Sequence, residues 1–193
     1  MTIEQITDIL QNNVSKEIID NIVNSVCEGD TDVNDIFDLM NNTDNDKVKF
    51  HAAWVLEKLY IKDNGLLNSL FTDLLELFPT IQHIGQKRTL VKIIITYLEF
   101  AFKGKNTVIS NEYFKSYDWE LIIESLFDSL IKRDTPPGLK MLCGYGLAYL
   151  SFRYEWIKDE LRYQMQSQLD SQAIITGNKK VNIILSKKCK TII

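Results

Sequence analysis

Apolar residues recur at helical spacing along most of this chain. In the stretch KVKFHAAWVLEKLY at residues 47–60, Ala52, Ala53, Leu56 and Leu59 gather on one side of a helix, and lysines flank them. Alternating apolar and polar runs bounded by Asn-Gly or Asp-Gly turns are nearly absent. The pattern therefore predicts an all-α protein of about nine helices.

The helical pattern also repeats along the chain. Four segments of twelve residues have apolar or small residues at their fifth and ninth places, and they begin at Val48, Lys87, Leu139 and Val181. Their starts lie 39, 52 and 42 residues apart. This period is typical of helix pairs stacked along a solenoid, in which each pair buries its faces only when the next pair stacks on it.

Two of these segments carry a family resemblance. The first contains Val48, Lys49, Ala52, Ala53, Leu56 and Leu59, and the third contains Leu139, Lys140, Gly144, Gly146, Leu147, Ala148 and Leu150. Both resemble the first helix of HEAT repeats, for which V-R-x-x-A-A-x-A-L-G-x-L is typical. The resemblance covers most of residues 47–193 and implies a short right-handed α-solenoid of the HEAT or armadillo kind. Such folds support scaffolding, protein binding and occasionally catalysis, so the fold alone names no function.

We expect a single domain over residues 1–193. Its helix pairs are predicted over residues 15–41, 47–79, 87–132 and 137–170, followed by an unpaired terminal helix over 179–192. Ser15 and Thr31 are the expected N-caps of the first pair. The second helix of the next pair is expected from Leu66 to Phe78, because Pro79 cannot continue a helix interior.

The third pair contains an insertion over residues 103–116. This segment is polar and has no helical stripe, so it is predicted to be a loop at one edge of the stack. Use by a partner and a tolerated surface insertion both stay open for it.

The charge distribution differs between the two helices of each pair. The net charge is −4, but acids dominate the expected second helices and lysines the first helices. In HEAT-like solenoids the second helices usually line the concave face, so the resemblance implies an acidic inner surface. Such a surface repels phosphates, so no nucleic-acid partner is expected. Two solvated faces of opposite bias are the alternative interpretation.

Tryptophans mark the other candidate contacts. YDW at residues 117–119 and YEW at 154–156 each begin a second helix with the same order of tyrosine, acid and tryptophan. Packing of Trp119 and Trp156 between repeats and use as partner anchors are both open. Trp54 has the same two alternatives, and burial against the following repeat is favoured.

The sequence offers little catalytic or metal-binding chemistry. His51 is expected on the solvent side and His83 in a turn, and neither has a metal-ligand spacing. Cys27, Cys143 and Cys189 lie far apart and are expected to be free thiols. The CGYG stretch around Gly144 and Gly146 indicates close helix packing. We therefore expect no enzyme activity, metal or cofactor. Without a signal peptide or a long apolar run, no membrane contact and a cytoplasmic location are expected.

These observations predict a non-enzymatic scaffold that binds a protein or peptide, with a basic segment, on an acidic concave face. The candidate contact residues are Asp73, Glu76, Trp119, Glu120, Glu124, Asp128, Trp156, Asp159 and Tyr163. Two alternatives stay open. One is a DNA glycosylase of the HEAT-like alkylpurine kind, and the other is a structural subunit that oligomerises through its last helix.

Overall fold

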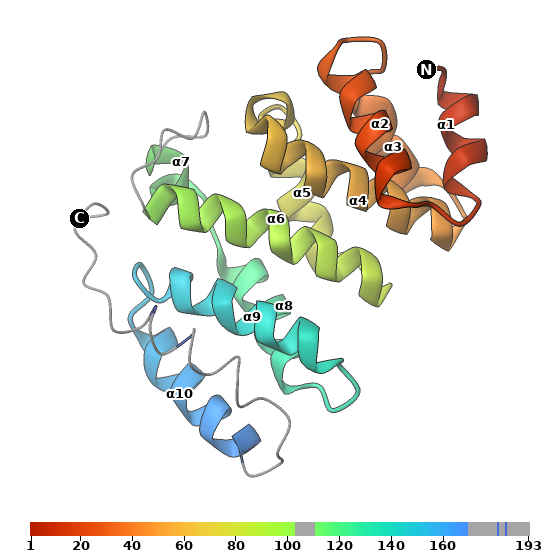
Figure 1. The fold of residues 1–193 in the computed structure, drawn as a ribbon. Helices are drawn as coiled ribbons and strands as arrows, with labels where there is room; N and C mark the ends of the chain where they lie inside the picture. Colours follow the sequence, from red (N-terminus) through yellow and green to blue (C-terminus); the bar gives the residue numbers. More distant parts are fainter. Residues whose placement is uncertain (103–110, 170–180, 182–183, 185–193) are drawn as a thin grey trace. The chain divides into compact units, whose positions relative to one another are not determined.

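The computed structural model describes residues 1–102, 111–169, 181 and 184. Across these residues the secondary structure is helical: ten α-helices and two short 3₁₀ helices, with no β-strand (Figure 1). The all-α prediction is confirmed. The chain divides into two compact units, Met1–Ile93 and Ile94–Ile193, and the division falls inside one long helix.

The first unit is built around a central helix. Its helices are α1 (Ile3–Leu10), α2 (Lys16–Cys27), α3 (Val33–Asn42), α4 (Asp46–Lys62), α5 (Phe71–Leu77) and the first part of α6 (Ile84–Phe102). Helix α4 packs against α1, α2 and α3. Its Ala52 and Ala53 are fully buried, and their small side chains let the neighbouring helices approach. Trp54 is partly exposed, so it is neither fully buried against the following repeat nor fully available as an exposed anchor.

The N-terminal helix α1 was missed by the sequence analysis. Thr2 accepts a hydrogen bond from the Gln5 backbone N–H, and the Gln5 side chain accepts one from the Thr2 N–H. This reciprocal pair is a capping box, and its Thr-x-x-Gln spacing was readable in the sequence.

The two expected caps have different outcomes. Ser15 accepts from the Ile18 N–H and caps α2, as predicted. Thr31 is not a cap: its hydroxyl is buried, 2.8 Å from the Ser25 hydroxyl, and Asp32 caps α3 instead. A carboxylate suits this position because the helix N-terminus exposes unpaired N–H groups.

The single helix expected over residues 66–78 is wrong. The chain forms a 3₁₀ helix at Asn64–Leu67, then α5, then a second 3₁₀ helix at Phe78–Thr80. Asp63 accepts a hydrogen bond from the Gly65 N–H at 3.0 Å and starts the first of these turns. The α-helix does end before Pro79, as expected.

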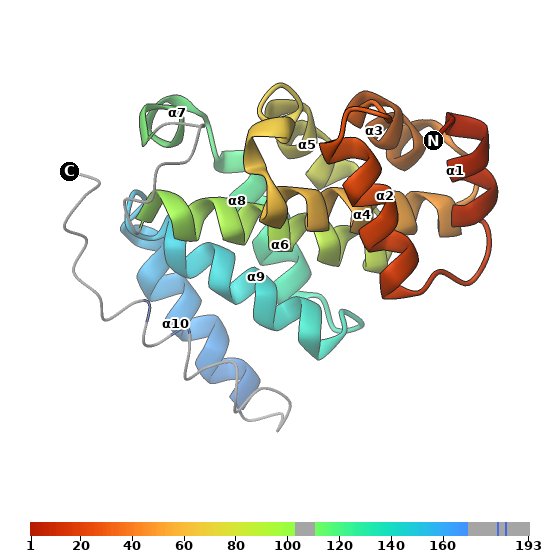
Figure 2. The same ribbon diagram turned by 45° about the horizontal axis from the view of Figure 1, so that its top comes forward.

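The second unit contains the end of α6 together with α7 (Asn111–Ser116), α8 (Glu120–Ile131), α9 (Pro137–Leu150) and α10 (Trp156–Leu169). Helix α9 packs against both α8 and α10, and lies between them (Figure 2). A Cβ at Gly146 would lie 3.1 Å from Leu126 Cδ1. Close packing around Gly146 is therefore confirmed.

Two predictions fall partly outside the described residues. The loop expected over residues 103–116 is wrong for 111–116, which form α7; residues 103–110 lie outside the described part. Of the terminal helix expected over 179–192, only Val181 and Ile184 are described, and both are helical and buried. Cys189 also lies outside it.

Candidate partner-binding surface

The exposed side of α8 is acidic. Glu120, Glu124 and Asp128 are exposed, and their spacing of four residues aligns them along the helix. Asp118, just before the helix, accepts a hydrogen bond from the Glu120 N–H at 3.0 Å. The acid of the YDW stretch thus pairs with an N–H at the start of α8, where its negative charge interacts favourably with the helix dipole.

The same side of α8 carries two large apolar side chains that the sequence analysis missed. Leu121 is 67% exposed and Ile131 is 51% exposed. Leu121 lies three residues before Glu124 and Ile131 three residues after Asp128, so both are on the polar side of the helix. Two large apolar residues outside the buried stripe of the predicted helix were the signal in the sequence for this exposed surface.

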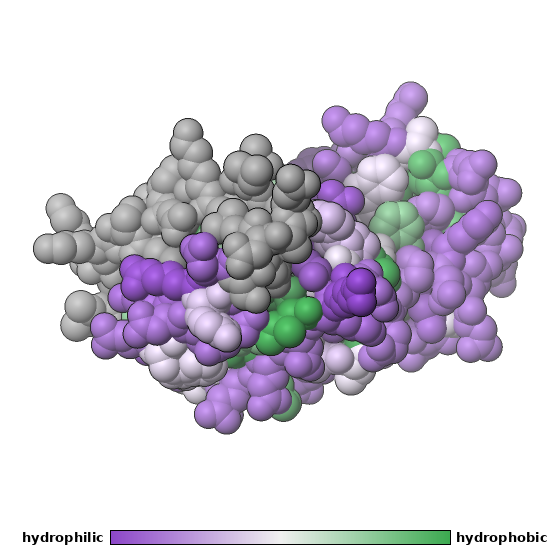
Figure 3. Space-filling view, turned by 90° about the horizontal axis from the view of Figure 1, so that it is seen from below, coloured by the Kyte–Doolittle hydropathy of each residue, from purple (hydrophilic) through white to green (hydrophobic). Residues whose placement is uncertain are grey.

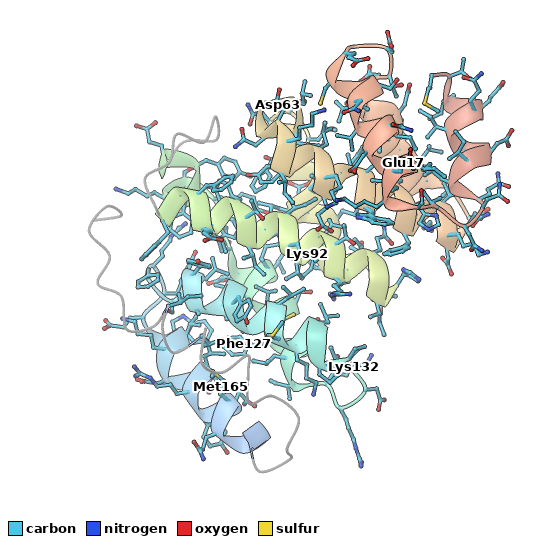
Figure 4. The ribbon with its side chains drawn as sticks, in the orientation of Figure 1. Glu17, Asp63, Lys92, Phe127, Lys132 and Met165 are labelled. Atoms are coloured by element: carbon cyan, nitrogen blue, oxygen red, sulfur yellow. The ribbon has the colours of Figure 1, made fainter. Side chains whose placement is uncertain are left out.

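Helix α10 presents an exposed aromatic side. Trp156 is 56% exposed and Tyr163 is 69% exposed, and Asp159 is exposed between them. The three residues follow a spacing of three and four, so they share one side of the helix. The opposite side is buried and consists of Ile157, Leu161 and Met165; the last is labelled in Figure 4.

Phe127 of α8 and Trp156 of α10 join these two sides. Their ring centroids lie 6.0 Å apart with an interplanar angle of 22°, and Phe127 is buried while Trp156 is not. Phe127, labelled in Figure 4, therefore supports one face of the indole. We name this region the α8–α10 surface; it comprises Glu120, Leu121, Glu124, Asp128, Ile131, Trp156, Asp159 and Tyr163.

Exposed large apolar side chains are few in the described part of the chain. Hydrophilic residues predominate on the face drawn in Figure 3, and hydrophobic ones appear in small separate areas. Four of the eight exposed large hydrophobic side chains in the described part belong to the α8–α10 surface. Such clustering is typical of protein interaction sites.

Trp119 does not belong to an exposed surface, although it was a candidate contact residue. It is fully buried, and its indole N–H donates a hydrogen bond to the Phe114 carbonyl at 3.1 Å. Its ring stacks on Tyr97 with centroids 5.9 Å apart. Helix α7 brings Phe114 over the indole, so Trp119 is a core residue.

The remaining acidic candidates lie in the first unit. Asp73 and Glu76 are exposed on α5. The acidic trough that was expected to join them to α8 and α10 stays a prediction.

Lys92, one of the lysines expected on the first helices, lies on α6 and forms an ion pair. Its ammonium lies 2.9 Å and 3.2 Å from the two oxygens of buried Glu57. Lys92, labelled in Figure 4, therefore serves packing between α4 and α6.

The histidines have structural roles. His51 is partly buried, and its Nδ1 lies 2.7 Å from the Leu10 carbonyl oxygen, so its expected place on the solvent side is wrong. His83 lies in the turn before α6, as predicted, and its Nδ1 accepts a hydrogen bond from the Gln86 N–H. Within residues 1–102 and 111–169, no group of three or more His, Cys, Asp or Glu side chains is arranged to hold a metal ion.

None of the described helices is long and apolar enough to cross a membrane. Cys27 is half-buried, and Cys143 is buried in α9.

Packed α-helices joined by short turns, with apolar segments that recur along the chain, define a helical repeat protein. A family profile for the HEAT repeat domain matches residues 6–104, more than half of the chain. The chain therefore belongs to the HEAT repeat family, and the predicted family is confirmed. The match begins inside α1, upstream of the segments that carried the resemblance. Searches of curated proteins and of solved structures returned no match. HEAT repeats form helical scaffolds that often mediate protein interactions.

Proposed function

We propose that this protein is a non-enzymatic scaffold that binds a protein or peptide through acidic helix faces. The α8–α10 surface is the observation that carries this proposal, because it combines four exposed carboxylates with four exposed apolar or aromatic side chains. Membership in the HEAT repeat family supports the scaffold role. We include a cytoplasmic location in the proposal.

The two kinds of side chain serve different steps of binding. Carboxylates attract a basic partner over a Debye length of about 8 Å at physiological ionic strength, which mainly raises the association rate. Exposed Trp156 and Tyr163 lose water contact only when a partner covers them. Aromatic side chains that become buried at an interface in this way usually supply most of the binding free energy and slow dissociation.

Affinity capture from the native cell, followed by mass spectrometry, tests the proposal. We define the surface triple variant as Glu120→Lys, Glu124→Lys and Asp128→Lys. It should lose the captured partner, or bind it with a slower association rate, while its circular dichroism spectrum stays helical.

A control triple variant makes the same change of charge away from the α8–α10 surface. It consists of Asp8→Lys, Glu28→Lys and Asp44→Lys, all exposed in the first unit. Loss of the partner in the surface triple variant but not in the control supports the proposal. Equal capture of the partner by both variants at low salt would mean that the acidic residues of α8 face solvent and do not contribute to binding.

The same protein samples separate the two alternative functions. Duplex DNA should bind no tighter than the nonspecific range of about 10⁻⁴ to 10⁻⁶ M near physiological salt, because an acidic surface repels phosphates. A salt-sensitive nanomolar complex with DNA would replace the scaffold by a glycosylase. Self-association as the sole activity would favour an oligomerising subunit.

A further inference from the structure

We infer that the α8–α10 surface receives a basic amphipathic α-helix of its partner. This inference rests on the proposed function and specifies the partner's chemistry. It draws on the spacing of the apolar side chains, the helical character of the surface and the row of carboxylates on α8.

The apolar side chains recur at distances that suit a helix. Trp156 and Tyr163 are seven residues apart on α10, which corresponds to about 10 Å along the helix axis. Leu121 and Ile131 are ten residues apart on α8, about 15 Å. Positions i and i+7 of a partner helix are about 10 Å apart, which matches Trp156 and Tyr163, and a further turn to i+11 spans the distance between Leu121 and Ile131.

A helical surface also disfavours an extended partner. An extended peptide gains its main-chain hydrogen bonds from the open edge of a β-sheet. The described part of the second unit contains only helices and turns, whose backbone groups are largely paired within the helices. An α-helix suits this surface because it satisfies its own backbone groups.

The charge of the surface determines the charge of the partner. Glu120, Glu124 and Asp128 follow one another about 6 Å apart along α8. Lysine or arginine residues at i and i+4 of a partner helix have the same axial spacing. Asp159 already pairs with Arg162 at 3.4 Å, so the carboxylates of α8 contribute most of the complementarity.

Trp156 provides the anchor between the two helices. One face of its indole is stacked on Phe127, which fixes the ring, and more than half of the side chain is exposed. A ring held in this way can accept an aliphatic side chain, or an arginine on its π face, with little loss of rotamer freedom.

A synthetic peptide tests the inference directly. The probe is an end-capped peptide of about 18 residues, roughly five helical turns, with leucine at i, i+3, i+4 and i+7 and lysine or arginine elsewhere. Its comparison peptide has the same composition, but its leucines are placed at i, i+2, i+4 and i+6, a spacing that suits a strand and removes the helical stripe. Fluorescence anisotropy of each labelled peptide measures binding to the full chain.

The helical probe should bind the full chain at least about tenfold more tightly than the alternating peptide, if helical presentation matters. The surface triple variant and Trp156→Ala should each weaken binding of the probe about tenfold, and the control triple variant should not. Tyr163→Ser gives an independent reading from α10 if Trp156→Ala alters the packing on Phe127.

Four results would overturn the inference. Equal binding of both peptides would show attraction by charge alone, and no effect of Trp156→Ala and Tyr163→Ser would exclude the aromatic anchor. A dimer that the surface triple variant disrupts, seen by analytical ultracentrifugation, would identify a second copy as the occupant. If the probe fails while the native partner is still lost in the surface triple variant, the scaffold function holds and only the helical partner is wrong.

Discussion

Two glycines of α9 allow a matched test of the packing in the second unit. A Cβ at Gly144 would lie 3.5 Å from Val181 Cγ2, an ordinary van der Waals distance. A Cβ at Gly146 would lie only 3.1 Å from Leu126 Cδ1, and Leu126 is fully buried. The two positions are in the same helix, two residues apart, and differ mainly in this contact.

The expected free energies follow from this difference. Replacing a helical glycine by alanine raises helix propensity by about 1 kcal/mol, so Gly144→Ala should stabilise the fold by up to that amount. Gly146→Ala gains the same propensity, but overpacking of a filled core costs about 1–3 kcal/mol. We therefore expect Gly146→Ala to be less stable than Gly144→Ala by about 1–3 kcal/mol.

Urea unfolding followed by far-ultraviolet circular dichroism measures both variants against the unmodified chain. Gly146→Ala should cost less in a Leu126→Ala background than in the unmodified chain, because the smaller side chain makes room for the new methyl group; Leu126→Ala alone is the reference for the double variant. Equal stabilisation by both alanine variants would refute the close contact between α8 and α9.

Three further predictions concern polar side chains that are buried or half-buried. Lys92→Met should destabilise the first unit by about 3 kcal/mol because it leaves the carboxylate of Glu57 buried without its cation, and thermal unfolding of that variant beside Lys92→Arg tests this. Burial, followed by the charge of Glu99, raises the pKa of Tyr149 to about 12. Folding stability should therefore fall as the pH rises from about 10 to about 12, because in that range the phenol ionises readily only in the unfolded state. Tyrosinate absorbance follows the titration, and Tyr149→Phe should reduce the loss of stability. Arg153→Lys should cost about 1–2 kcal/mol, measured by urea unfolding, because a lysine cannot reproduce the two guanidinium hydrogen bonds to backbone carbonyls at the end of α7.

Local signals predicted the helical framework well. The all-α class and the cap at Ser15 depend on residues within a few positions of each other, and the periodicity of apolar residues reports them directly. The close packing predicted around Gly146 involves a residue distant in sequence and was still confirmed, because a glycine inside an apolar helix usually marks the close approach of another element.

Features that depend on distant residues could not be predicted. The bond between His51 and the Leu10 carbonyl joins positions 41 residues apart, and no pattern around His51 indicates it. The division of the 66–78 segment into α5 and its flanking 3₁₀ turns reflects tertiary packing over helix propensity. Helix α7 is only six residues long, too short to show a periodic stripe.

The YDW and YEW stretches show how context decides the role of one motif. Both place a tryptophan at the start of a second helix, yet Trp119 is fully buried and Trp156 is more than half exposed. Trp119 precedes α8 and is covered by Phe114 from the short helix before it, whereas Trp156 is the first residue of α10 and stacks on Phe127 with one face. If the exposed ring of Trp156 were only a packing residue, Trp156→Phe would leave binding of a partner unchanged and alter stability instead. If the ring is an anchor, Trp156→Phe should weaken binding of the partner and shift the unfolding midpoint no more than Tyr163→Phe does. Isothermal titration calorimetry of both variants with the captured partner separates the two cases.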